Sequence, residues 1–227
     1  MRHAAWVRVI ERIYQEQVAH AWGHYVFRLL RAVFTTNTAL SQEGGFVFDW
    51  MVRNYVDSTL MLIRRELDLQ AGAESLKNLL LDMIAHPTVV TRERYLANWD
   101  EPVRRWAANR MFDQFVSNSD ADHLSPDLIN ADLARLDASA DHLRKYAERT
   151  KAHRTPEQGL TIEGMTFAAL HEAIATVRDV IAKYYALLTH NSLAQWEPVA
   201  QFNTLQAFTK PWVLDRSAVN RAINEER

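Results

Sequence analysis

A basic block with one histidine follows a long helical pattern in the second half of the chain. Arg149 and His153 lie four residues apart in this block. On a continuing helix that spacing puts both side chains on one face. Histidine moves protons near neutral pH, and arginine supplies a fixed cation that pairs with phosphate. Metal-independent RNA cleavage needs both functions, so the block is a candidate site for that chemistry.

The same block also has a purely structural interpretation. A histidine just after a helix end, flanked by Lys151 and Arg154, is a good partner for the negative end of the helix dipole. It needs no catalytic role to be there. The residue types alone leave both interpretations open.

A second row of titratable residues lies near the N-terminus. Glu16, His20 and His24 fall at successive i, i+4 positions of an expected helix over 4–34. Such a row could begin a metal site in a bundle core. No matching Glu-x-x-His pair occurs elsewhere in the sequence, and cysteine is absent. We therefore favour a solvated or interface face for this row, and we predict no metal and no cofactor.

Two long helices joined by a loop should position the basic block. Ser125, Pro126 and Asp127 are an N-cap, a first-turn proline and a carboxylate suited to the positive end of the dipole. Apolar residues then recur every three or four positions. Thr166 offers a second N-cap. We predict helices over 125–153 and 166–190 that pack antiparallel, with the 154–165 loop at one end.

The remaining sequence predicts an all-α antiparallel helical bundle. Hydrophobic residues make up 48% and charged residues 24% of the 227 positions, and only six glycines and six prolines punctuate the chain. Apolar stripes upstream of Ser125 mark further helices. We expect one domain over 1–190 and a C-terminal tail over 191–227 that packs on it, because spaced aromatic residues continue into the tail.

Charge and hydropathy limit the partners. The formal net charge of −2 does not indicate a surface that binds nucleic acid nonspecifically, so RNA binding would need a local basic patch. Lys145, Lys151 and Arg154 form such a patch. No segment has the roughly 20 apolar residues that a membrane span requires, and the N-terminal residues do not resemble a signal peptide. We expect no membrane partner and a cytoplasmic location.

The stretch "LRKYAERTKAHRTPEQG", followed by "TFAALHEAIATVRDVIAKYYALL", resembles the AbiU-type branch of the HEPN superfamily, which is associated with abortive phage infection. The upstream segment "MLIRRELDLQAGAESLKNLLLDMI" extends this resemblance. It covers roughly residues 46–188. It implies a helical domain, a homodimer that pairs two basic hinges, and a function in phage defence, with a cognate partner protein as a further expectation.

HEPN ribonucleases combine an arginine with a later histidine, with four to six residues between the two. The resemblance carries the histidine function onto His153. The arginine positions fall on Ala147 and Glu148, and Arg149 is one residue too close. Arg149 is therefore the candidate phosphate clamp, and Tyr146 should line the same face. Two functions stay open: a metal-independent endoribonuclease, or a degenerate module that dimerises and binds RNA, nucleotide or protein. The acidic Glu148 at an expected arginine position favours the degenerate module.

Overall fold

A computed structural model describes residues 1–147, 166–192, 196, 199, 203–209 and 217. This part of the chain is helical, and within it the β-structure is a single bridge between Thr91 and His123. The elements in chain order are α1 (Arg2–Thr36), α2 (Thr38–Glu43), α3 (Gly45–Glu66), α4 (Leu76–Ala85), η1 (Pro87–Val89), α5 (Arg92–Leu96), α6 (Pro102–Phe112), η2 (Asp113–Phe115), α7 (Pro126–Ala147), α8 (Phe167–Thr189) and η4 (Thr204–Thr209). The predicted all-α bundle is confirmed.

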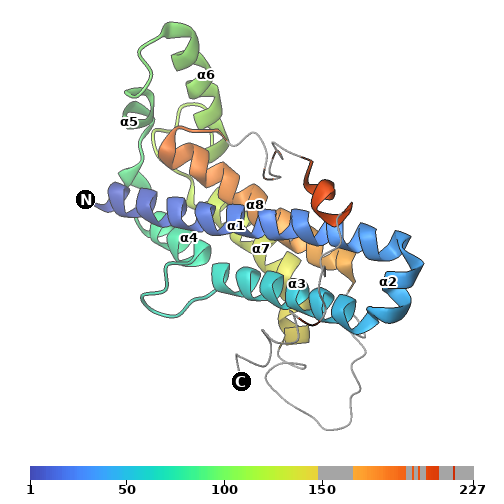
Figure 1. Cartoon of the computed structure of the whole chain (residues 1–227). Helices are drawn as coiled ribbons and strands as arrows, with labels where there is room; N and C mark the ends of the chain where they lie inside the picture. The colour runs from blue at the N-terminus through green and yellow to red at the C-terminus, as the bar shows by residue number, and fades with distance from the viewer. Residues whose placement is uncertain (148–165, 193–195, 197–198, 200–202, 210–216, 218–227) are drawn as a thin grey trace.

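Helix α8 lies at the centre of the bundle and packs against α1, α3 and α7 (Figure 1). Helix α4 packs on α7 and α1, while α5 and α6 extend beyond the end at which α1 begins. This arrangement leaves one face of α8 against α1 and α3, which is where polar side chains gather.

Helices α7 and α8 pack antiparallel, as predicted. Lys183 Nζ donates to Asp132 Oδ2 at 2.6 Å, and the Arg135 guanidinium pairs with Asp179 at 3.6 Å. The partner number falls along α8 as it rises along α7, which only antiparallel helices allow. The predicted second helix over 166–190 matches α8, and Thr166 caps it by accepting the Ala169 N–H. The first is described to Ala147, so its expected extension to 153 lies outside the described residues.

The predicted apolar stripes form the core. The buried stripe residues of the two helices are Ile129, Leu133, Leu136, Ala140 and Leu143 on α7, and Leu170, Ile174, Val177, Ile181, Tyr184 and Leu188 on α8. The Tyr184 hydroxyl is buried too, and it donates to Asp132 Oδ2 at 2.9 Å. None of the helices in the described ranges combines the length and apolarity that a membrane crossing requires.

Glu66 ends α3 inside the core, where it is 1% exposed. Its Oε2 accepts the Leu76 N–H at 3.3 Å and so joins α3 to the start of α4. Burial raises the pKa of this carboxyl from 4.5 to about 7. The folded state therefore holds a proton that the unfolded state releases between these two values, and stability falls as pH rises through this window.

We expect Glu66→Gln to remove this pH dependence. Glutamine keeps the acceptor for Leu76 N–H and carries no charge, so the variant should gain on the order of 2–3 kcal/mol relative to wild type between pH 4.5 and pH 8. Urea unfolding at both pH values measures the difference. Glu93→Gln, at an exposed position of α5, is the control and should show no such change. If the free energy of unfolding changed equally with pH in wild type and in Glu66→Gln, the carboxyl of Glu66 would not have a raised pKa in the folded protein.

Candidate functional site

The hinge predicted from the sequence lies mostly outside the described residues. Those positions are Glu148, Arg149, Lys151, His153 and Arg154, all within 148–165. Tyr146 and Lys145 lie in the last turn of α7, and the description covers their backbone only. The catalytic and RNA-binding assignments made for the hinge stay predictions.

A cluster of polar aromatic side chains occupies the contact between α1, α3 and α8. His20 and His24 come from α1, Tyr55 from α3 and His171 from α8. The i, i+4 spacing puts both α1 imidazoles on the face that packs inward, where they are half-buried. Of the two alternatives favoured for the Glu16, His20 and His24 row, the solvated face is wrong for its histidines, which lie in a contact between helices.

The Tyr55 hydroxyl joins two imidazoles from different helices. It lies 2.6 Å from His24 Nδ1 and 3.0 Å from His171 Nε2. A phenol has one proton to donate, so it accepts an N–H from one imidazole and donates to the other. Burial raises the Tyr55 pKa, which keeps this proton in place at neutral pH. The Tyr55 ring stacks on Phe27 at 4.1 Å, which fixes the position of the hydroxyl.

The contacts of His20 define its tautomer. Thr59 Oγ1 donates its single proton to the Tyr55 carbonyl at 2.8 Å, so it accepts from His20 Nε2–H at 2.8 Å. His20 Nδ1 then presents a lone pair to Arg178, whose Nη2 lies 3.0 Å away. Burial, followed by the charge of Arg178, lowers the His20 pKa to about 4. His20 is thus neutral at physiological pH and orients the guanidinium.

Positive charge surrounds the cluster. Burial lowers the pKa of His171, and the nearby charges of Arg31, Arg178 and Arg28 lower it further. Arg31 also lies over the Phe167 ring, 5.1 Å from its centroid. The carboxylate at this rim, Asp179, faces Arg135 on α7. The local field therefore favours an anion although the whole chain is slightly acidic.

These side chains line a cavity of about 260 Å³ between α1, α3 and α8. Its polar wall consists of His20, His24, Tyr55, His171, Arg178 and Asp179, and it also touches Trp196. A larger groove of about 830 Å³ begins on the other side of His20 and Tyr55 and runs between α1 and α3. The cavity is large enough for a phosphate group with part of a sugar or base.

The third member of the α1 row faces away from this cavity. Glu16 pairs with Arg65 at 2.6 Å and with Arg12 at 3.6 Å. Within the described ranges, no three acidic or histidine side chains are placed to hold a metal ion. His20 Nδ1 faces a guanidinium, and Tyr55 engages one nitrogen each of His24 and His171. The side chains of this cluster can transfer protons and contact an anion.

Tyr55, His171 and Arg178 did not stand out in the sequence. Tyr55 belongs to an apolar stripe of α3, and His171 and Arg178 are two polar residues seven apart beside the stripe of α8. Their shared face, two helical turns long, was the available signal. Only packing shows that this face meets the α1 histidines.

We expect Arg178→Met to raise the pKa of His20. Removing the guanidinium deletes the second cause of its shift, while burial, the largest cause, remains. The pKa should therefore rise above about 4 yet stay below 6.5, as measured by a pH titration of the His20 imidazole with NMR. The His142 imidazole, exposed on α7, serves as the internal control. An unchanged His20 pKa would contradict the contact with Arg178.

Comparison of the chain with protein-family models, with curated proteins and with solved structures yields no match.

Proposed function

We propose that the cavity between α1, α3 and α8 is a metal-independent acid–base site and that the protein is a HEPN-like endoribonuclease of phage defence. One observation carries this proposal: a tyrosine hydroxyl bridges two imidazoles beside an oriented arginine. The resemblance of residues 46–188 to the HEPN superfamily supports the RNA substrate class and the biological setting.

The chemistry requires two proton transfers and one fixed cation. The ribose 2′-oxygen would form a bond to phosphorus while the bond from phosphorus to the 5′-oxygen breaks. One imidazole of the His24 and His171 pair would accept the 2′-proton, and the other would give a proton to the leaving 5′-oxygen. Tyr55, hydrogen-bonded to both, lets the two imidazoles differ in protonation. Arg178 would hold the phosphate oxygens and balance their charge.

The positions of the arginines favour phosphate as the group that enters. Arg178 lies in the cavity wall, and Arg28 and Arg31 lie close enough to influence His171. Histidines alone would give a site that loses its charge above pH 6.5, whereas guanidinium groups keep theirs. The guanidinium groups can therefore attract a phosphodiester at neutral pH, where His171, whose pKa is lowered, can serve as the base and His24 as the acid.

Cleavage of RNA and not of DNA of the same sequence tests this proposal. DNA lacks the 2′-hydroxyl that the mechanism uses as nucleophile, so wild type should cut only the RNA. The reaction should proceed in excess chelator because no step uses a metal. Loss of cleavage in chelator, or equal cutting of DNA, would overturn the mechanism.

The degenerate module is the second candidate function, and one observation favours it. The guanidinium of Arg178 already donates to the neutral His20, so it can hold a phosphate without any proton transfer. In that case wild type would bind RNA without cutting it, and Arg178→Met would weaken binding. A nucleotide or a cognate protein partner would be the alternative ligand of this module.

We propose that the protein is a homodimer that forms through α1 and α3. Apolar side chains around the groove between these helices are exposed, among them Trp50 at 64% and Met61 at 61%. Arg64 and Asp68 also line the groove, so that in a two-fold contact the basic group of one copy could pair with the acidic group of the other. Large exposed apolar patches mark interaction sites.

We expect Trp50→Glu to convert the dimer to a monomer, because a buried unpaired carboxylate would oppose association. Light scattering at tens of micromolar measures the mass. Trp106, on α6 at the other end of the molecule, has the same exposure of 65%, and Trp106→Glu should leave the dimer intact. A monomeric wild type would refute the dimer.

A further inference from the structure

A separate cavity of about 340 Å³ lies where the first turn of α1 meets α5 and the end of α8. Its polar wall consists of His3, Arg94, Tyr95, Asn98 and His190, and three aliphatic side chains complete it. His3 and His20 are 17 positions apart on one helix, or about 25 Å at 1.5 Å per residue. This cavity is therefore distinct from the proposed ribonuclease site.

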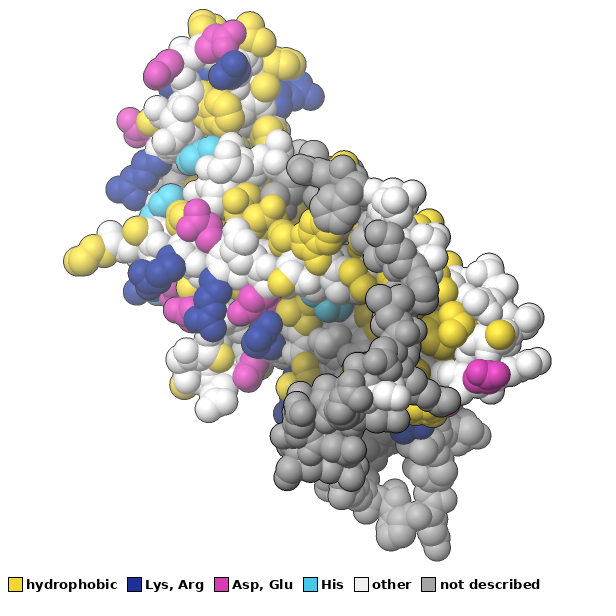
Figure 2. Space-filling view, viewed as in Figure 1, with side chains coloured by type: hydrophobic (Ala, Val, Ile, Leu, Met, Phe, Trp, Pro, Cys, Tyr) yellow, Lys and Arg dark blue, Asp and Glu magenta, His cyan; other side chains and the backbone are white. Residues whose placement is uncertain are grey.

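We propose that this cavity binds a small dianion of the phosphate class, such as inorganic phosphate or a phosphomonoester. Arg94 provides a permanent cation, and its Nη1 is held in place by a bond of 3.1 Å to the Val89 carbonyl. His3 and His190 each add an imidazole that can donate. Figure 2 shows histidine and basic side chains together on the surface near the start of α1.

The groups of this cavity repel one another when charged. Burial, and next the charge of Arg94, lower the His3 pKa, and burial followed by the charge of His3 lowers that of His190. No carboxylate is among the causes of either shift. A bound dianion would relieve this repulsion and would accept hydrogen bonds from the imidazoles.

His190 has two features that packing leaves unexplained. Its Nδ1 is buried and has no hydrogen-bond partner among the described residues, although a buried polar atom without a partner costs about 1–3 kcal/mol. Its backbone is also left-handed, with φ of 61°, unlike any other non-glycine residue in the described ranges. Glycine would close α8 there with less strain. Backbone strain and an unbonded ring nitrogen are typical of a residue that contacts a ligand.

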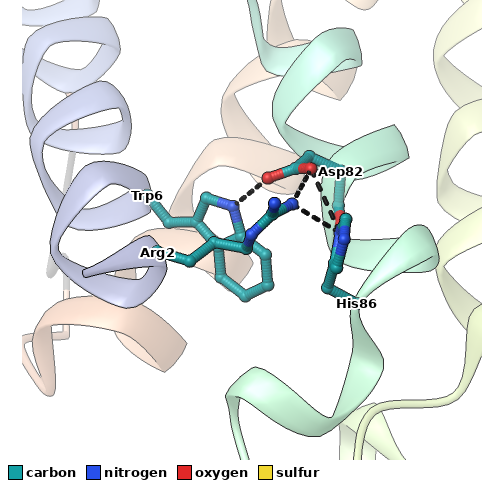
Figure 3. A network of polar contacts seen from close by, with 4 residues as sticks. All are labelled: Arg2, Trp6, Asp82 and His86. Carbon is teal, nitrogen blue, oxygen red and sulfur yellow. Dashed lines mark hydrogen bonds and ion pairs between the residues drawn. The ribbon is translucent and has the colours of Figure 1, made fainter.

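The walls of the cavity are fixed before any ligand arrives. Arg2 Nη1 lies 2.6 Å from His86 Nδ1 and also bonds to Asp82, which accepts the Trp6 Nε1–H at 2.6 Å as well (Figure 3). This network ties the first turn of α1 to α4 and so fixes His3. On the opposite wall the His190 ring packs on Tyr95, with centroids 5.0 Å apart. A rigid site loses little entropy on binding.

Calorimetric titration of the full chain with inorganic phosphate at constant ionic strength tests this proposal. We expect wild type to bind one phosphate per chain with Kd below about 1 mM. Arg94→Gln and His190→Asn should each raise Kd at least tenfold, since each removes a charge-assisted hydrogen bond. Asparagine tolerates the left-handed backbone, so the second variant keeps the end of α8. In NMR titrations, phosphate should raise the pKa of the His190 imidazole.

The matched control is Arg105→Gln. Arg105 also donates to a neighbouring carbonyl, that of Leu96 at 3.0 Å, but it lies outside the cavity. It should bind phosphate like wild type. The proposal is overturned if wild type shows no heat of binding at 10 mM phosphate, if Arg105→Gln weakens binding as much as Arg94→Gln, or if acetate binds as well as phosphate. None of these outcomes depends on RNA cleavage.

Discussion

Replacement of His171 by alanine is expected to lower the rate of RNA cleavage about 100- to 10,000-fold, the usual contribution of a general acid or base. His171 Nε2 contacts the hydroxyl of Tyr55, 3.0 Å away, and its ring lines the cavity that would hold the phosphate. The alanine variant loses one of the two proton carriers. Initial rates on one labelled RNA in chelator, at saturating RNA, measure the effect on kcat.

A surface histidine provides the control for this experiment. His142 lies exposed on α7, and His142→Ala should cleave RNA at the wild-type rate. His171 is only half-buried, so its alanine variant should keep the helical circular dichroism of wild type. A His171→Ala variant that folds and cleaves normally would remove this residue from the mechanism.

The second large effect concerns the core. Leu80 and Leu81 are neighbours on α4, but Leu80 is fully buried whereas Leu81 is 40% exposed. Leu80→Ala should lower the free energy of unfolding by about 3–5 kcal/mol, because it loses transfer free energy and leaves a cavity. Leu81→Ala should cost less, about 1 kcal/mol, since its side chain is already partly exposed to water in the folded protein. Urea unfolding of both variants gives the comparison.

Similar losses for the two leucines would mean that α4 does not pack as described. This pair is informative because both substitutions are chemically identical and occur in the same helix. The two substitutions change helix propensity equally, so a difference between their losses of stability reports the difference in burial.

The sequence predicts most of this fold because the information is local. Apolar residues recur at helical period on α7 and α8, and Thr166 accepts the N–H that its position before α8 predicts. The bounds of α8 agree with the expected 166–190 to within one residue. Antiparallel packing is the usual arrangement of two long amphipathic helices that follow one another in the chain.

The candidate site was harder to predict because it depends on contacts between distant parts of the chain. Tyr55 and His171 are 116 positions apart, and no local pattern links them. The spacing of His20 and His24 showed that they share a helix face. Whether that face meets water, a metal or another helix is decided by how α1 packs on α3 and α8. The sequence predicted a different site, the basic hinge with His153, which lies outside the described residues.

The most direct test of the cavity as the catalytic site compares His171→Ala with His153→Ala in one RNA cleavage assay in chelator. Our account predicts that His171→Ala loses at least 99% of the wild-type rate and that His153→Ala keeps most of it. The opposite result, an inactive His153→Ala and an active His171→Ala, would place the chemistry at the basic hinge and contradict the account.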